Sequence, residues 1–197
     1  MEPEIYKPSI HKGAGIYNTG AEGGGGGGGN DGYIRLDIDG IEYTAVRIGN
    51  KFFTTENFVN IFSGQIEIGA PFGSSSARWV NGNESFSREN KYNLLYSIAA
   101  IDVIESNLHD GWRVCTKSDF DYIANNFGSI EKLEKWQTND FGFSLVQNGN
   151  CEGNASFFNV GVVANMRTRT HMCNFYYNYD TAIVDRFAAI RLCKDVV

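Results

Sequence analysis

Four cysteines and three histidines are the residues best suited to covalent or metal chemistry in this chain. The thiols belong to Cys115, Cys151, Cys173 and Cys193, and the imidazoles to His11, His109 and His171. The cysteines form no CxxC pair, and no Cys/His pair has the spacing of zinc ligands. His171 and Cys173 alternate on an expected strand, but two ligands do not make a site. We therefore expect separate buried thiols, no metal and no cofactor, with a disulfide left open for a protein that works outside the cell.

A second group of side chains, between Asn159 and Arg186, suits the recognition of a ligand. Tyrosine supplies rigid amphipathic area, while asparagine and arginine supply adaptable hydrogen bonds, as in antibody paratopes. The face expected to lie in the core comprises Cys173, Phe175, Tyr177 and Tyr179. The face expected to be exposed and to bind ligand comprises Asn165, Arg167, Arg169, His171, Asn174, Tyr176 and Asn178. The alternative is a fixed aromatic strand pair in the core.

Composition and charge narrow the class of protein. Of the 197 residues, 42% are hydrophobic and 20% are charged, which suits one globular core with an appendage. The net charge of −6 argues against general nucleic-acid binding, because phosphate contacts need clustered cations. The sequence contains no run of roughly 20 apolar residues, the length needed to cross a bilayer. Its acidic first residues are not expected to be a secretory signal.

Residues 1–32 differ from the rest and are expected to form a separate N-terminal segment. Gly23 to Gly29 are consecutive glycines, which have no side chains to bury and a high entropic cost of ordering. They predict a flexible tether. The mixed segment before them has too few apolar residues to fold by itself. We interpret it as a docking peptide or an oligomerisation strand, and a disordered tail is an equally good alternative.

Residues 33–197 are expected to form strands, then helices, then strands again, which predicts an α+β fold. Strands and extended segments are expected at Ile34–Ile38, Tyr43–Ile48, Lys51–Phe58, Phe157–Val163, Cys173–Tyr179 and Ala188–Val196. The clearest helix begins at Thr116, where Thr116 and Asp119 fit a capping box. Its apolar face comprises Phe120, Ile123, Ala124 and Phe127. Further helices are expected at Ser129–Trp136 and Leu94–Leu108.

Three residues beside the capped helix have expected structural roles. Trp112, which follows Asp110-Gly111, is expected to fill the core beside the start of the helix. Arg113 and Arg191 have apolar neighbours, so each is a candidate partner for a buried carboxylate. Ordinary surface arginines at strand ends are at least as good an interpretation of both.

Four segments, taken together in order, carry a resemblance to a known family. They are Gly40–Asn50 running into Phe52–Asn57, Tyr92–Ala100, Asp110–Thr116 and Phe187–Asp195. The series resembles the major paralogous (FISUMP) domains of Bacteroidetes-type bacteria and their phages. Those domains belong to the formylglycine-generating-enzyme-like, C-type-lectin-like folds. Cys115 and Cys193 depart from the pattern, since the family usually has Pro and Val there, and it often has Trp where Phe52 and Phe53 stand.

The resemblance implies a C-type-lectin-like domain over residues 33–197, with short strands around two or three helices. Formylglycine-generating enzymes use two closely spaced cysteines that bind copper, and the wide spacing here makes an oxidase the weakest interpretation. Calcium-dependent sugar binding is not expected either. No Pro follows Pro71, so the Glu-Pro-Asn or Gln-Pro-Asp triplet of true C-type lectins does not occur. The oxygens of Asn81, Asn83 and Glu84 are interpreted as a polar turn.

These observations together lead us to expect a ligand- or receptor-binding module, not an enzyme. We expect it on a phage virion as a fibre, decoration protein or adhesin, or on another extracellular surface. The chain resembles lectin-fold variable proteins of diversity-generating retroelements, whose mutable residues precede a closing strand. The expected ligand is a cell-surface glycan or protein, and residues 1–32 are expected to anchor the module to the virion or to an oligomer such as a trimer. The alternatives are a bacterial surface-binding protein and, less favoured, a formylglycine-type oxidase.

Overall fold

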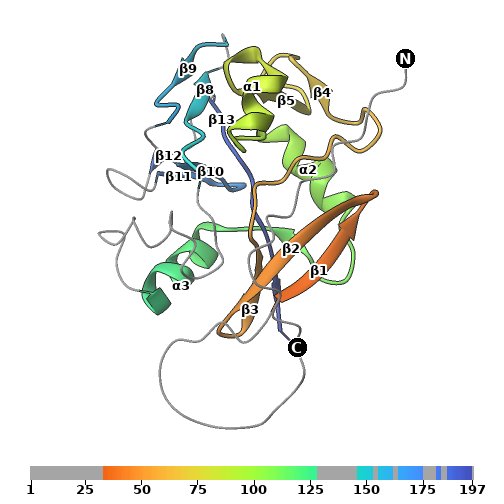
Figure 1. Ribbon diagram of the computed structural model, residues 1–197, viewed down its shortest axis with the longest axis vertical. Coiled ribbons are helices and arrows are strands. Elements are labelled where there is room, and N and C mark those ends of the chain that lie inside the picture. The colour runs from red at the N-terminus through yellow and green to blue at the C-terminus, as the bar shows by residue number, and fades with distance from the viewer. Residues whose placement is uncertain are drawn as a thin grey trace, which may run out of the picture.

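The computed structural model describes residues 33–127, 146–152, 155–161, 164–174, 181–182 and 186–196. Its strands up to the second helix are β1 (Tyr33–Ile38), β2 (Ile41–Ile48), β3 (Lys51–Thr54), β4 (Glu67–Ile68), β5 (Ser76–Trp79) and β6 (Leu94–Tyr96). The later strands are β7 (Arg113–Val114), β8 (Asn150–Glu152), β9 (Phe157–Phe158), β10 (Asn165–Arg167), β11 (His171–Asn174), β12 (Thr181–Ala182), β13 (Arg186–Phe187) and β14 (Leu192–Asp195). The helices are α1 (Glu84–Glu89), α2 (Ala99–Ser106) and α3 (Lys117–Phe127), with a 3₁₀ turn η1 (Val80–Gly82) before α1. The expected α+β class is confirmed (Figure 1).

The largest sheet has the strand order β1-β2-β3-β14-β7. Its first hairpin turns at Asp39-Gly40, whose φ angles of 52° and 78° match the tight turn that suits twisted strands. The last strand, β14, lies between β3 and β7, with Cys193 opposite Phe53 on one side and opposite Arg113 on the other. The first and last strands of the domain therefore lie in one sheet.

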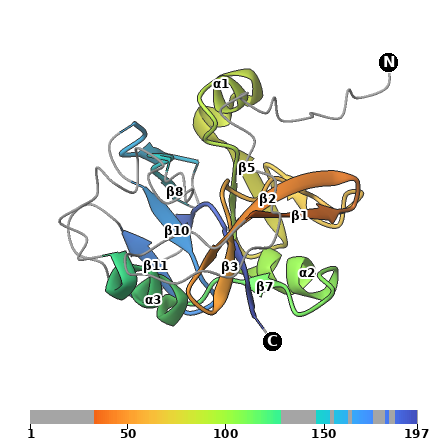
Figure 2. The ribbon, with the colours of Figure 1, turned by 60° about the horizontal axis from the view of Figure 1, so that its bottom comes forward.

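The two hydrophobic clusters of the core lie on opposite faces of this sheet. On β2, Tyr43 and Ala45 belong to one cluster while Val46 and Ile48 belong to the other. On β14, Leu192 belongs to the cluster of Tyr43 and Cys193 to the cluster of Val46, because successive side chains of a strand point to opposite faces. Helix α2 packs into the cluster that contains Tyr43, and α3 packs into the cluster that contains Val46. The sheet therefore lies between the two helices, as Figure 2 shows.

The capping box expected at the start of α3 is confirmed. The backbone N–H of Asp119 donates to Thr116 Oγ1 at 3.3 Å, and the backbone N–H of Thr116 donates to Asp119 Oδ2 at 2.8 Å. Phe120 and Ile123, one turn further on, are buried in the core, as their spacing predicted. A short-range pattern therefore determines where this helix begins and which side faces the sheet.

The helix expected at Leu94–Leu108 begins five residues later than predicted. Leu94–Tyr96 form β6 instead, antiparallel to β5, and the helix starts at Ala99. Leu94 and Tyr96 contribute to one core cluster and Leu95 to the other, so this short apolar run is buried on both sides. Such a run suits a buried strand as well as a helix, and the pairing with β5 decides between them.

The segment from Arg186 to Asp195 joins all four sheets. Phe187 pairs with β8, Ala188 forms a bridge to Tyr96 of β6, and Ala189 forms a bridge to Met166 of β10 before β14 enters the large sheet. Residues 187–193 are all buried. The strand predicted at Ala188–Val196 is therefore a regular strand only from Leu192 to Asp195.

Several expectations concern residues beyond those described. The helix predicted at Ser129–Trp136 and the N-terminal segment lie outside the described residues, as do the last parts of the strands predicted at Phe157–Val163 and Cys173–Tyr179. Within the described ranges, none of the helices is long and apolar enough to cross a membrane.

Candidate functional site

The seven residues predicted to bind ligand do not form one exposed face. Asn165 and Arg167 are fully buried, so their predicted exposure is wrong. The reason is that β10 pairs with β11 on one side and meets the closing segment on the other, where the Arg167 N–H donates to Ala189 O at 2.6 Å. The Asn165 amide donates to Asn150 Oδ1 at 3.3 Å, and the Arg167 guanidinium donates to the carbonyl of Arg186. Both side chains therefore form hydrogen bonds inside the protein and not with a ligand at the surface.

Arg169 and His171 lie at the turn between β10 and β11. Thr168 closes this turn, since its N–H donates to His171 O at 2.9 Å and its hydroxyl accepts from His171 N at 2.8 Å. Arg169 is exposed and forms ion pairs with Asp102 and Glu105 of α2, each at 2.6 Å. Arg169 therefore ties the turn to α2 while part of its side chain stays in contact with solvent.

The remaining predicted residues are described only in part. Asn174 ends β11, but its side chain, Tyr176 and Asn178 lie outside the described residues. On the opposite face, Cys173 is buried as predicted, whereas Phe175, Tyr177 and Tyr179 also lie outside. Of the predicted binding surface, the described residues therefore include only the end of the β10–β11 hairpin, around Arg169 and His171.

A cavity of about 310 Å³ lies at another place, among three turns of the chain. We call it the turn pocket. Its lining residues are Leu36, Asp37, Ile38, Asp39, Phe62, Ser63, Gln65, Asn107, Leu108, His109, Asp110 and Trp112. They come from the end of β1 and the turn after it, from the loop before β4, and from the segment between α2 and β7. A volume of this size is at the lower end of ordinary small-ligand pockets.

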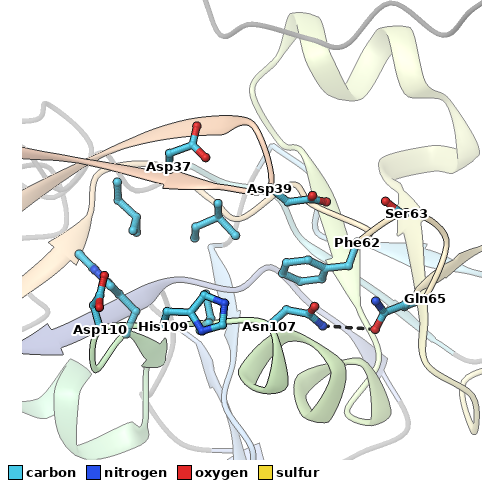
Figure 3. A pocket seen from close by; sticks show the side chains of 12 residues that line it. Asp37, Asp39, Phe62, Ser63, Gln65, Asn107, His109 and Asp110 are labelled. Atoms are coloured by element: carbon cyan, nitrogen blue, oxygen red, sulfur yellow. Dashed lines mark hydrogen bonds between the residues drawn. The ribbon is translucent and has the colours of Figure 1, made fainter.

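The lining of the turn pocket divides into an acidic rim and an apolar part. Figure 3 shows Asp37 and Asp39 on one side, His109 and Asp110 on the other, and the ring of Phe62 between them. Asn107 Nδ2 donates to Gln65 Oε1 at 3.3 Å, which joins the second and third segments across the pocket. The twelve lining residues include three aspartates but no lysine or arginine. The pocket therefore favours neutral or cationic ligands over anionic ones.

Unusual backbone conformations position these side chains. Phe62 and Ser63 have φ angles of 47° and 53°, a left-handed conformation that is uncommon for residues other than glycine. The Phe62 N–H donates to the buried Asn60 Oδ1 at 2.6 Å, and Phe62 O accepts from Gln65 N at 3.1 Å. Asp110 has a φ of 56° in a turn closed by the Trp112 N–H, which donates to His109 O at 3.0 Å. Such conformations persist where the surrounding contacts hold them, often at binding sites.

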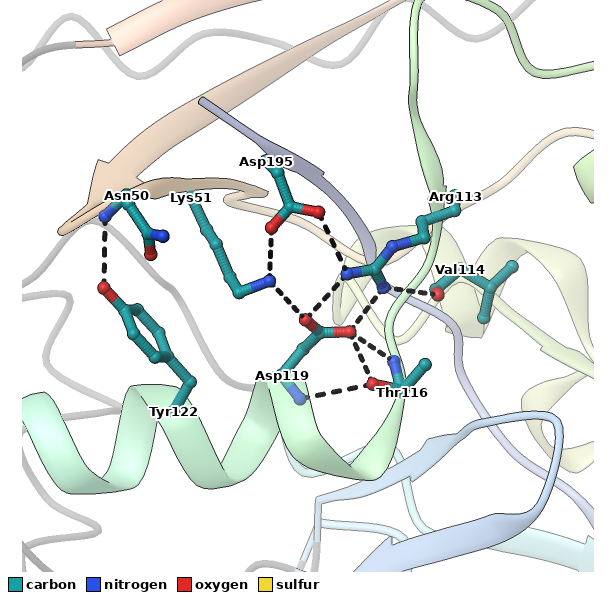
Figure 4. A network of polar contacts seen from close by, with 8 residues as sticks. All are labelled: Asn50, Lys51, Arg113, Val114, Thr116, Asp119, Tyr122 and Asp195. Atoms are coloured by element: carbon teal, nitrogen blue, oxygen red, sulfur yellow. Dashed lines mark hydrogen bonds and ion pairs between the residues drawn. The ribbon is translucent and has the colours of Figure 1, made fainter. Parts of the chain in front are cut away.

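A network of charges around Asp119 holds β7, the strand that comes directly after the last residue lining the turn pocket (Figure 4). Arg113, the first residue of β7, donates to Asp119 Oδ1 at 2.9 Å, and Lys51 Nζ lies 3.1 Å from the same oxygen. Asp195 contacts both cations from β14. Burial of the Asp119 carboxyl opposes its ionisation, but hydrogen bonds from Arg113, Thr116 and Lys51 outweigh burial and hold its pKa well below the ordinary value. This network joins β3, β7 and β14 to α3.

Arg113 and Arg191, each expected either to pair with a buried carboxylate or to lie at the surface, have different surroundings. Arg113 pairs with a carboxylate whose side chain is only 3% exposed, so the pairing with a buried carboxylate is confirmed for it. Arg191 is fully buried, which excludes the surface interpretation, and it donates to Asn57 Oδ1 and Thr54 O, both at 2.8 Å. Burial lowers the pKa of Arg191 to about 9. Trp112 lies in the core, as predicted, but in the cluster that packs against α2 and not beside the start of α3, because it faces the other side of the sheet.

All four cysteines are buried free thiols that belong to one core cluster. Burial raises the pKa of Cys151 to about 11, and burial together with the neighbouring Cys193 thiol raises that of Cys115. In the described part of the chain, no three His, Cys, Asp or Glu side chains gather into a group that suits a metal ion.

Sequence reasoning missed the turn pocket, although part of it was visible. Asp110-Gly111-Trp112 stands in one of the segments that resemble a known family, and the Asp39-Gly40 pair is a recognisable turn signal. No local pattern brings these two turns together with the loop at Phe62. Comparisons of the chain with protein-family models, curated proteins and solved structures give no match.

Proposed function

We propose that this protein is a ligand-binding module, not an enzyme, and that it recognises a neutral, hydroxyl-rich ligand in the turn pocket. A sugar unit of a cell-surface glycan is the ligand class with this chemistry. The observation that carries the proposal is the convergence of three carboxylates and two side-chain amides beside apolar groups in one cavity. The C-type-lectin-like fold is part of the proposal. Its support is the α+β order of elements, with the last strand, β14, paired to β3 in the same sheet as the first hairpin.

The chemistry of the pocket suits a sugar in two ways. Carboxylates such as Asp39 and Asp110 accept hydrogen bonds only, and sugar hydroxyls donate them readily, whereas amides both donate and accept. Apolar side chains such as Leu36 and Phe62 offer a surface to the C–H groups of a sugar ring. The aspartates also disfavour a phosphorylated or carboxylated ligand through charge repulsion.

The setting in which the module works is also a proposal, and it rests on the sequence. Residues 1–32, with their glycine run, anchor the module to a virion or an oligomer, and the binding domain is displayed outside the cell on a phage fibre or decoration protein. A bacterial surface-binding protein is the alternative. Capsid, tail or reverse-transcriptase genes beside the coding gene favour the phage setting, whereas a polysaccharide or lipoprotein locus favours the bacterial one.

A glycan array probed with the full chain, followed by titration of the best glycan, tests the function. We expect neutral glycans to bind, and the double variant Asp39→Asn/Asp110→Asn to lose at least tenfold in affinity. Its melting temperature should stay close to that of the wild type, because asparagine also tolerates the left-handed backbone at both positions. The matched control, Glu89→Gln/Asp121→Asn, changes the net charge equally outside the pocket and should bind normally.

Chemical-shift mapping on the same glycan separates the two candidate surfaces. We expect perturbed amides at residues 36–39, 62–65 and 107–112. Perturbations at 168–174 instead, with a loss of binding in Arg169→Ala/His171→Ala, would place the ligand on the β10–β11 hairpin end and reject the turn pocket. That second surface remains a candidate because Arg169 is exposed and already positioned by α2.

A further inference from the structure

Strand β1 lies at the edge of the large sheet, with β2 on one side and no strand of the described chain on the other. All six of its residues pair with β2 in one unbroken register. Two of them, Tyr33 and Ile34, are large apolar residues with exposed fractions of 45% and 36%. Edge strands usually carry a feature that blocks further pairing, such as a proline, a bulge or a lysine, and β1 has none of these. Its edge can therefore accept another strand.

The hairpin turn decides which backbone groups of β1 face the open edge. Because both central residues of the Asp39-Gly40 turn have positive φ, the turn is closed by hydrogen bonding between Ile38 and its partner on β2. Bonded and non-bonded pairs alternate along an antiparallel ladder, so the N–H and C=O groups of Tyr33, Arg35 and Asp37 point away from β2. No hydrogen bond from another described segment reaches these backbone groups.

The charges of β1 select one way of pairing two copies of this strand. In an antiparallel pair with Leu36 opposite Leu36, the outward backbone groups of Arg35 meet those of Asp37 in the second copy. Opposite charges then face each other twice, once on each side of a two-fold axis, and such cross-strand pairs are stabilising. Alignments that set Arg35 against Arg35, or Asp37 against Asp37, place like charges opposite each other. The favoured alignment also sets Ile34 against Ile38 of the second copy, which covers exposed apolar area.

We propose that the open edge of β1 is an interaction surface for a second copy of this chain, and that antiparallel pairing centred on Leu36 joins the two large sheets into one. The side chains of Arg35 and its present partner Glu42 are both exposed, so Arg35 can turn toward the second copy. Leu36 and Asp37 also line the turn pocket, and the pairing therefore places the pockets of the two copies on either side of the two-fold axis. The surface does not depend on what the pockets bind.

Sedimentation velocity of the full chain over a series of concentrations, at low salt and without glycan, tests the proposal. We expect a reversible equilibrium between monomer and dimer. Arg35→Glu and Asp37→Lys should each weaken dimerisation by roughly tenfold or more, because each variant replaces two attractive pairs across the axis with two like-charge pairs. The matched control Lys117→Glu changes the net charge as much as Arg35→Glu but lies on α3, and it should dimerise like the wild type.

A mixture of the two variants distinguishes pairing at this edge from a general effect of charge. In a dimer of one Arg35→Glu chain and one Asp37→Lys chain, opposite charges again face each other on both sides of the axis. The mixture should therefore dimerise about as tightly as the wild type, although neither variant does so alone. Circular dichroism checks that each variant is folded. Asp37→Asn, which keeps an acceptor for the Gly40 N–H, covers the case in which Asp37→Lys does not fold, and it should weaken dimerisation by a smaller factor.

Three results would overturn the proposal. The first is a wild type that stays monomeric at every concentration. The second is an assembly that Arg35→Glu and the Asp37 variants leave unchanged. The third is a mixture of the two charge variants that associates no better than either variant alone.

Discussion

Replacing Asp119 with alanine is expected to lower the free energy of unfolding by about 3–4 kcal/mol. The change removes a carboxylate that is almost fully buried and deletes one half of the capping box of α3. It also leaves Arg113 and Lys51 with only the exposed Asp195 as a shared partner. Unfolding by urea, followed by circular dichroism, measures the loss. Asp121→Ala is the matched control on the same helix. Its i,i+4 pair with Lys117 is much more exposed, so the expected change is within about 0.5 kcal/mol.

The same carboxylate makes stability depend on pH in the acid range. Because the folded protein holds the pKa of Asp119 below its value in the unfolded chain, ionisation of this group stabilises the fold above that unfolded value, about pH 4. The contribution is lost as pH falls further toward the folded pKa. The wild type should therefore lose stability between about pH 5 and pH 2 more steeply than Asp119→Ala. Parallel curves for the two proteins would show that Asp119 is not the group responsible.

Replacing Gly149 with alanine is expected to cost about 3–5 kcal/mol of stability, for two reasons that add. The φ angle of Gly149 is +63°, which strains any residue with a β-carbon. A β-carbon there would also lie 2.3 Å from the carbonyl oxygen of Phe158 and 2.8 Å from the Val160 nitrogen. These are backbone atoms of the adjacent strand and loop, which do not move aside as a flexible side chain would. Thermal unfolding of the variant measures the combined cost.

Gly40→Ala separates the two contributions. Gly40 has a similar φ of +78°, but a β-carbon there would meet nothing within 4 Å. The expected loss is therefore the conformational part alone, about 1 kcal/mol. Equal losses at both glycines would contradict this explanation. They would mean that the backbone at Phe158 to Val160 moves away from Gly149 without cost, although the two segments are closely packed.

The elements that the sequence predicted correctly are those built by residues close together in the chain. Thr116 and Asp119 cap α3 across a single turn, and the strands expected at Ile34–Ile38 and Tyr43–Ile48 pair across the short Asp39-Gly40 turn. The prediction failed at Leu94–Tyr96. A run of three buried apolar residues suits a strand or a helix, and the pairing with β5, which lies outside the run, decides between them.

The candidate binding surfaces depend even more on contacts between segments that are far apart in the chain. The chemistry of Asn165 and Arg167 suits ligand contact at a surface, yet β10 is enclosed by β11 and the closing segment, and both side chains bond inside the protein. The turn pocket needs three turns that are far apart in the chain to meet. In each case the surroundings of the side chains depend on how distant segments pack together.

The sequence by itself determined the α+β class, the capped helix, the first hairpin and the acidic character of the chain, because these follow from interactions within a few residues or from composition alone. Tertiary structure decided which polar residues are buried and where the pocket forms. Those outcomes depend on which strands become neighbours and in what register. Arg191 reaches Asn57 and Thr54 only because its segment lies beside the end of β3. In the same way Arg113 contacts Asp195 only because β14 lies beside β7, although the two segments are far apart in the chain. No pattern within either segment encodes that register.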